Sequence, residues 1–110
     1  MSDIQELTQA ILQFRDERDW AQFHTGKDLA MCLSVEAAEV LELFLWKPDP
    51  NAVDHTRLRD ELADVLYSAL LLAAHYNLDA RQIVLDKLAK NREKYPVEKA
   101  RGRNDKWDAL

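Results

Sequence analysis

The sequence predicts an all-α fold, and three observations lead to that fold class. Its 110 residues include only 2 Gly and 3 Pro, fewer turn-forming residues than a β-sandwich or barrel of this length needs. Apolar residues recur at helical intervals along four stretches of the chain. Hydrophobic residues make up 47% of the chain, although a domain this small buries only roughly two thirds of its unfolded surface. We therefore expect a four-helix, bundle-like fold in an obligate homo-oligomer.

The first helix is expected to begin after Ser2 and to run to about Asp19. Ser2 and Gln5 have the spacing of a capping box, which satisfies backbone N–H groups at a helix start. Apolar residues then recur at helical intervals: Ile4, Leu7, Ile11, Leu12 and Phe14. Residues 20–26 are expected to form a connector, in which Gly26 breaks the helical pattern.

The second helix is expected from residue 27 or 28 to residue 45 or 46, because Pro48 disfavours helical backbone at Lys47. Residues 35–46 contain nine apolar residues interrupted by three glutamates, so apolar side chains point in nearly every direction. Such a helix is expected to be buried on most sides, by its own fold and by a second subunit.

Glu36 and Glu39 lie within that apolar stretch and share one face of the helix, because they are three residues apart. A carboxylate in apolar surroundings costs several kcal/mol unless positive charge compensates it. The alternative is a narrow solvated stripe that includes Glu42.

The third helix is expected at residues 57–76, after a loop that contains two prolines. Glu61 and Asp64 repeat the three-residue spacing of carboxylates on this helix. Antiparallel packing of the second and third helices would therefore bring four carboxylates together. Oxygen ligands without Cys or His suit Mg²⁺, with Mn²⁺ as the alternative, and Mg²⁺ usually shares its coordination with substrate phosphates. The pattern predicts a phosphate-handling centre.

The fourth helix is expected at residues 80–94, with Asp79 and Gln82 as a capping pair and Pro96 after its end. Residues 97–110 are highly charged and are expected to be extended. The sequence thus predicts a helical domain at 1–96 followed by a charged C-terminal tail at 97–110.

The charge of the chain is unevenly distributed. The net charge of −5 disfavours a general nucleic-acid-binding protein, and no apolar run is long enough to cross a membrane. Residues 81–106 carry nine Lys and Arg against four Asp and Glu, so the acidic body is followed by a basic segment. A single cysteine and a polar N-terminus favour a cytoplasmic location.

Four sequence blocks carry a resemblance to a known family: Arg18–His24, Glu36–Lys47, Glu61–Leu66 and Lys87–Pro96. The order and spacing of these blocks resemble those of the MazG-like nucleoside triphosphate pyrophosphohydrolases. Within that family the chain is most similar to the small dCTP pyrophosphatase branch. The resemblance implies an α-helical enzyme that cleaves a nucleoside triphosphate between the α and β phosphates, releasing a monophosphate and pyrophosphate. It also implies self-association to a dimer or tetramer.

The resemblance implies a Mg²⁺ site with four ligands: Glu36, Glu39, Glu61 and Asp64. One carboxylate that is not fully committed to the metal could deprotonate the attacking water, and we assign that catalytic role to Glu39. Non-enzymatic alternatives are a helical oligomer with solvated acids and a metal-binding carboxylate bundle.

The resemblance also implies the substrate-binding residues. Trp20 and Trp46 are expected to stack on the base, with Trp46 about two helical turns beyond Glu39 on nearly the same face. His24 is expected to hydrogen-bond the nucleotide. The basic segment is expected to contact the phosphates through three residues that share a helix face: Lys87, Asn91 and Lys94.

Two positions depart from the family pattern. Ile11 stands where mammalian members have a histidine, and Ser68 stands where they have a tyrosine. Both positions belong to the nucleotide pocket in those enzymes, so we place Ser68 among the substrate-binding residues. The phosphate chemistry is therefore implied more directly than a preference for dCTP.

Overall fold

A computed structural model describes all 110 residues, and it contains 71% helix and no strands. This confirms the predicted all-α class. The chain forms two compact units, residues 1–78 and residues 79–110. The expected division into 1–96 and 97–110 stays a prediction.

Helix α1 (Asp3–Glu17) begins at the predicted capping box. The Gln5 N–H donates to Ser2 Oγ over 3.2 Å, and the Ser2 N–H donates to Gln5 Oε1 over 2.9 Å. The helix ends two residues earlier than predicted, because Asp19 has a φ of 52°, outside the right-handed helical region. The Gln22 side chain donates to both Asp19 Oδ2 and the Asp19 carbonyl, which fixes the connector before helix η1 (Ala21–Phe23).

Helix α2 (Gly26–Glu42) begins where Thr25 Oγ1 accepts a hydrogen bond from the Asp28 N–H. The prediction that Gly26 breaks the pattern is wrong, because Gly26 is the first residue of the helix. The Tyr76 side chain approaches Gly26 so closely that a β-carbon there would collide with the phenol. Glycine is therefore needed at this position for close contact between α2 and the end of the next helix.

The predicted end of α2 at residue 45 or 46 is also wrong. The helix ends at Glu42, and the backbone N–H groups of the next three residues donate to carbonyls three residues back. These tighter turns often close an α-helix. Trp46 then has a φ of 64°, so helical periodicity does not place its side chain.

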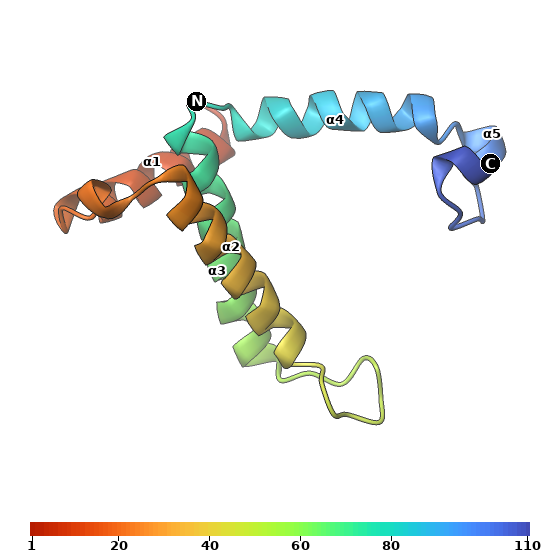
Figure 1. The fold of residues 1–110 in the computed structure, drawn as a ribbon, viewed down its shortest axis with the longest axis horizontal. Coiled ribbons are helices and arrows are strands. Elements are labelled where there is room, and N and C mark those ends of the chain that lie inside the picture. The colour runs from red at the N-terminus through yellow and green to blue at the C-terminus, as the bar shows by residue number, and fades with distance from the viewer. The chain divides into compact units, whose positions relative to one another are not determined.

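Helix α3 (His55–His75) begins two residues before its predicted start, because Asp54 Oδ1 accepts hydrogen bonds from the Thr56 and Arg57 N–H groups. Helices α2 and α3 lie side by side as an antiparallel pair, and α1 packs across α3 (Figure 1). The buried residues of this unit are Ile11, Leu29, Leu43, Ser68, Leu70, Leu71 and Ala73.

The core is small, and no large side chain is completely buried. Within α2 only Leu29 is buried, whereas Met31, Val35 and Leu41 are more than half exposed. The chain's own fold therefore does not cover the apolar faces of α2. None of the helices combines the length and hydropathy that crossing a bilayer requires.

The second unit contains helix α4 (Ala80–Lys94), with the predicted bounds and the predicted Asp79 cap on the Gln82 N–H. The prediction of an extended tail is wrong, because Pro96 is followed by helix α5 (Val97–Ala100) and later by helix η2 (Trp107–Ala109). Proline suits a helix start, since its fixed φ is compatible with one and it needs no partner for an N–H.

Candidate active site

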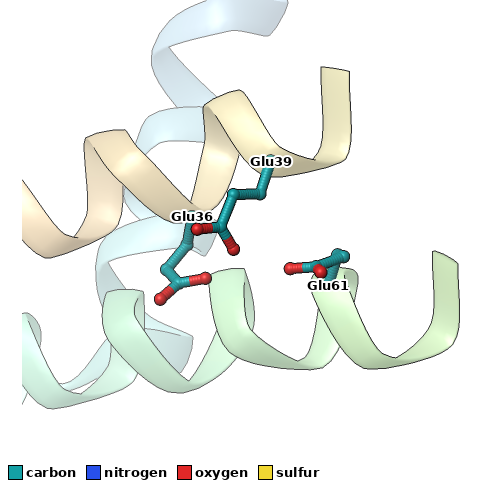
Figure 2. A group of neighbouring side chains, drawn as sticks. All are labelled: Glu36, Glu39 and Glu61. Atoms are coloured by element: carbon teal, nitrogen blue, oxygen red, sulfur yellow. The ribbon is translucent and has the colours of Figure 1, made fainter. Parts of the chain in front are cut away.

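Three glutamates from two helices meet between α2 and α3. Glu36 and Glu39 project from adjacent turns of α2, and Glu61 faces them from α3 (Figure 2). Each offers one carboxylate oxygen, and these oxygens all lie within 4.8 Å of one another. All three side chains are half-buried, so the alternative of a solvated acidic stripe is not supported for them.

The three glutamates fit a hard divalent cation. One oxygen of Glu36 and one of Glu61 are buried without a hydrogen-bond partner. The ion pairs of the chain lie elsewhere and leave these carboxylates without a basic partner. Buried carboxylate oxygens need compensation, and an all-oxygen donor set suits Mg²⁺ or Mn²⁺.

The closeness of these groups affects their titration. Glu39 raises the pKa of the Glu61 carboxyl, chiefly because a hydrogen bond between the two side chains requires a proton. Burial and repulsion from Glu39 and Asp64 raise the Glu61 pKa further, whereas Arg57 lowers it. The cluster thus holds more negative charge than it can stabilise alone.

Asp64 lies outside the group of three glutamates. It is exposed, one turn after Glu61 on α3, and it lines an open pocket of about 450 Å³ between α1 and α3. The residues that line the pocket are Ala10, Ile11, Phe14, Trp20, Asp64 and Tyr67. Because Glu61 and Asp64 are adjacent on one helix face, the pocket lies next to the carboxylate group.

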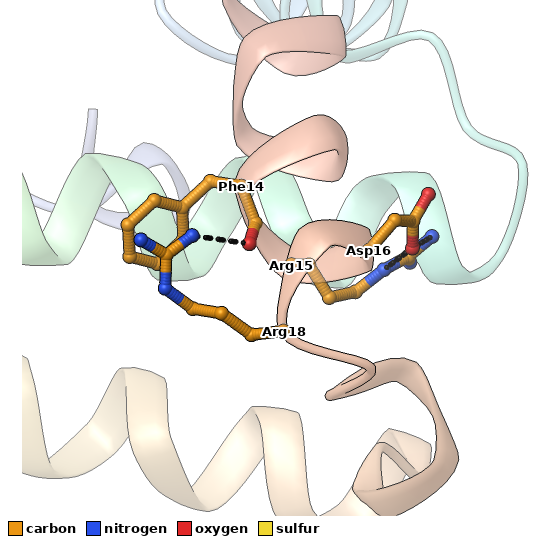
Figure 3. Close-up of polar contacts among 4 residues, drawn as sticks. All are labelled: Phe14, Arg15, Asp16 and Arg18. Atoms are coloured by element: carbon orange, nitrogen blue, oxygen red, sulfur yellow. Dashed lines mark hydrogen bonds and ion pairs between the residues drawn. The ribbon is translucent and has the colours of Figure 1, made fainter.

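Aromatic side chains build one wall of this pocket around Phe14. The Phe14 ring meets Trp20 edge to face at a centroid distance of 5.7 Å, and it meets Tyr67 in the same way at 6.3 Å. The Arg18 guanidinium lies 3.8 Å from the Phe14 ring centroid and donates to the Phe14 carbonyl (Figure 3). Trp20 remains 42% exposed, so part of its indole is free for a planar ligand.

Trp46 does not line this pocket. It follows the end of α2 in the α2–α3 loop, and its side chain is 98% exposed. Because α2 and α3 are antiparallel, Trp46 and the pocket lie on opposite sides of the glutamates along the helix pair. The structure therefore does not bring Trp20 and Trp46 together within one chain.

His24 follows η1 and is half-buried, with Nδ1 buried and without a hydrogen-bond partner. Burial lowers the pKa of His24, with Arg15 and His75 adding to the effect and Asp28 opposing it. The imidazole is therefore held in its neutral form near neutral pH, with one nitrogen able to accept a hydrogen bond.

Ser68 is buried at 7% exposure and is not among the residues that line the pocket. Its neighbour Tyr67 lines the pocket instead, a position that the sequence prediction missed. Burial raises the pKa of the Tyr67 phenol, so the hydroxyl stays protonated at physiological pH. Spacing from Asp64 does not separate the two residues, because Tyr67 and Ser68 follow Asp64 by three and four residues and both spacings share a helix face.

In the second unit, Lys87 and Asn91 share a face of α4 as predicted. They line a groove of about 410 Å³ together with Ile83, Val84 and Leu88. Lys94 is at the end of the same helix, where its ammonium lies 5.5 Å from the Trp107 ring centroid. Their contact with phosphates stays a prediction.

The sequence matches the MazG-like family over residues 31–110. It is 38% identical to dCTP pyrophosphatase 1 from Bos taurus, in an alignment that covers 97% of this chain and 68% of the relative. The corresponding Homo sapiens protein is 34% identical, with coverage of 97% and 67%. Among solved structures, a pyrophosphatase from Archaeoglobus fulgidus superposes with a TM-score of 0.77 at 32% identity, covering 87% of this chain and 94% of the other.

Proposed function

Since the chain belongs to the MazG-like family and is a nucleoside triphosphate pyrophosphohydrolase, we propose that Glu36, Glu39 and Glu61 form its catalytic metal site. The observation that carries this proposal is the group of three half-buried carboxylates with two unpartnered oxygens. A non-enzymatic helical oligomer or a metal store would not explain the aromatic pocket beside them.

Asp64 completes the ligand set from the adjacent turn of α3. When bound, Mg²⁺, or Mn²⁺ in its place, would neutralise the triphosphate and make a water molecule more acidic. Glu36 and Glu61 would hold the cation from opposite helices, because each has an oxygen with no partner in the protein. Glu39 would accept the proton of the attacking water, since its carboxylate belongs to the same group of oxygens, whereas the unpartnered oxygens that would hold the cation belong to Glu36 and Glu61.

The nucleoside of the substrate would occupy the pocket beside Trp20. Tyr67 is six residues after Glu61, which corresponds to about 9 Å along the axis of α3. A nucleotide with its base in the pocket can therefore extend its phosphates toward the glutamates. His24 would give a neutral hydrogen-bonding contact to the nucleotide, and Ser68 would support the pocket floor from the core.

The proposed preferred substrate is dCTP or a modified dCTP, because the mammalian relatives are named dCTP pyrophosphatases. The enzyme would act on the nucleotide pool of the cytoplasm, where the free thiol of Cys32 is stable. Two lysines and one asparagine of α4 would contact the phosphates and the leaving pyrophosphate: Lys87, Asn91 and Lys94.

We also propose a dimer or tetramer in which Trp46 of one copy reaches the pocket of another. A tryptophan that is 98% exposed leaves its whole indole available to a neighbour. The exposed apolar residues of α2 and α3 provide the contact surface: Met31, Val35, Leu41, Leu62 and Leu66.

Pyrophosphate release from a panel of dNTPs, with Mg²⁺ and with EDTA, tests the proposal. Glu39→Gln is expected to lower kcat by about 10²-fold or more, because it removes a proton acceptor beside the metal. Glu42→Gln is the matched control, since Glu42 lies on the same helix but outside the glutamate group, and it should retain activity. Equal activity of the two variants would refute the assignment of Glu39.

A further inference from the structure

The turn that follows helix α1 places one guanidinium against the aromatic wall of the pocket. Arg18 is the residue directly after α1, and its Nη1 donates to the Phe14 carbonyl over 2.9 Å. Its Cζ lies 3.8 Å from the centroid of the Phe14 ring and 5.9 Å from that of the Trp20 ring. Arg18 therefore lies beside two aromatic rings of the pocket without lining the pocket itself.

The ring contact of Arg18 matters more to its position than its ion pair does. Arg18 Nη1 lies 3.6 Å from Glu17 Oε2, and the two side chains are 41% and 57% exposed. Exposed ion pairs contribute little, because water and salt screen them. A guanidinium can stack its plane on a ring while its N–H groups donate to an oxygen, and Arg18 does both at Phe14 (Figure 3).

The indole of Trp20 depends on its neighbours for a fixed orientation. The chain leaves the helical path at Asp19, whose φ is 52°, and the Trp20 side chain is 42% exposed. Its aromatic partner is Phe14, at a centroid distance of 5.7 Å and an interplanar angle of 76°. Phe14 is itself 42% exposed, so the guanidinium that covers its ring limits the motion of both aromatic side chains.

We propose that Arg18 is a positioning residue, which acts through Phe14 to hold the Trp20 indole in the orientation that stacks on the base. This inference rests on the proposed placement of the nucleoside beside Trp20. A side chain that is already held before binding loses less entropy when the ligand arrives. Base stacking contributes equally to the ground state and the transition state, so loss of Arg18 should weaken binding and leave the chemical step unchanged.

The kinetic test is Arg18→Met, which removes the guanidinium and keeps an unbranched side chain. The KM for dCTP is expected to rise about threefold to tenfold, the effect of one cation–π contact, while kcat stays within about twofold. Glu17→Gln is the control, since it removes the ion pair and leaves the ring contact, and it should keep the wild-type KM. An unchanged KM in Arg18→Met would overturn the inference.

A double-mutant cycle separates the positioning of Trp20 from a general effect on the fold. In a Trp20→Leu background, Arg18→Met is expected to change KM by less than about twofold, because the indole through which Arg18 acts is absent. A structural role elsewhere in the domain would give the same factor in both backgrounds. That result would reject the positioning role.

A measurement without substrate distinguishes failure of this inference from failure of the proposed function. With Trp46→Phe and Trp107→Phe in place, Trp20 is the remaining tryptophan, and its emission reports its own mobility. Time-resolved fluorescence anisotropy should show a larger fast component in Arg18→Met than in Glu17→Gln. Arg18→Lys, which keeps the charge and loses the planar group, serves the same comparison if Arg18→Met does not fold.

Equal anisotropy decays in the arginine variant and the control would overturn the positioning role of Arg18 and leave the proposed function intact. Absence of pyrophosphate release by the wild type would instead overturn the proposed function. The anisotropy comparison then still decides whether Arg18 holds the Trp20 indole.

Discussion

Glu61 is the residue whose surroundings most clearly favour function over stability. Its raised pKa means that the folded protein holds the Glu61 proton more tightly than the unfolded chain does. The stabilisation from that proton is complete below the ordinary pKa of a glutamate and is lost as the pH rises through the raised value. At neutral pH the metal-free cluster therefore lacks this contribution.

Glu61→Gln should accordingly raise the melting temperature of the metal-free protein at pH 7, because the neutral amide removes repulsion from Glu39 and Asp64. The difference from wild type should shrink as the pH is lowered toward 4. Thermal unfolding in EDTA across this range measures the effect. Added Mg²⁺ should stabilise the wild type and not the variant, and a variant that melts below wild type at pH 7 in EDTA would contradict the explanation.

Site residues could be predicted from the sequence where their spacing along one helix shows that they share a face. The pairs Glu36–Glu39 and Glu61–Asp64 were recognised from spacing alone, and the structure brings three of these four residues together. Ser68 and Tyr67 could not be ranked in the same way. Which of the two lines a pocket depends on how α1 crosses α3, and adjacent residues on a helix point about 100° apart.

At the scale of elements, the starts of α1 and α4 were predicted correctly, whereas the end of α2 was not. The capping residues Ser2 and Asp79 act through short, local hydrogen bonds, and both mark the observed starts. The end of α2 is different, because Pro48 sets only an outer limit and the helix tightens into turns before reaching it. Trp46 was misplaced for this reason.

Asp54 is expected to stabilise the element that presents Glu61. Its side chain accepts two backbone hydrogen bonds at the start of α3, and loss of an N-cap typically costs about 1 kcal/mol. Asp54→Ala should lower the free energy of unfolding by about that amount, as measured by urea denaturation. Asp54→Asn should retain most of the stability, and an equal loss in both variants would show that charge rather than capping matters.

At the scale of the whole molecule, the small core and the exposed apolar residues support the proposed self-association. An isolated domain of this size buries only roughly two thirds of its unfolded surface, and here no large side chain is completely buried. Mixing two variants that are each inactive tests whether the subunits of the proposed oligomer share their active sites.

Trp46→Ala and Glu39→Gln are each expected to have low activity as pure proteins. In a symmetric dimer whose pockets take Trp46 from the partner, co-refolding equal amounts should restore about a quarter of wild-type activity, because half of the dimers are mixed and each has one complete site. Pyrophosphate release before and after mixing measures this recovery. Activity no greater than the sum of the separate variants would argue that each site is complete within one copy.

The backbone at Trp46 has a consequence for the enzyme at low concentration. A bulky residue at a φ of 64°, with nearly all of its side chain in water, is an unfavourable state for a chain on its own. If a neighbouring copy covers that indole, contact between copies offsets the cost and completes the pocket in the same step. Catalysis would then depend on encounter between subunits, so each newly synthesised chain would stay inactive until it met a partner and dilution would turn the enzyme off.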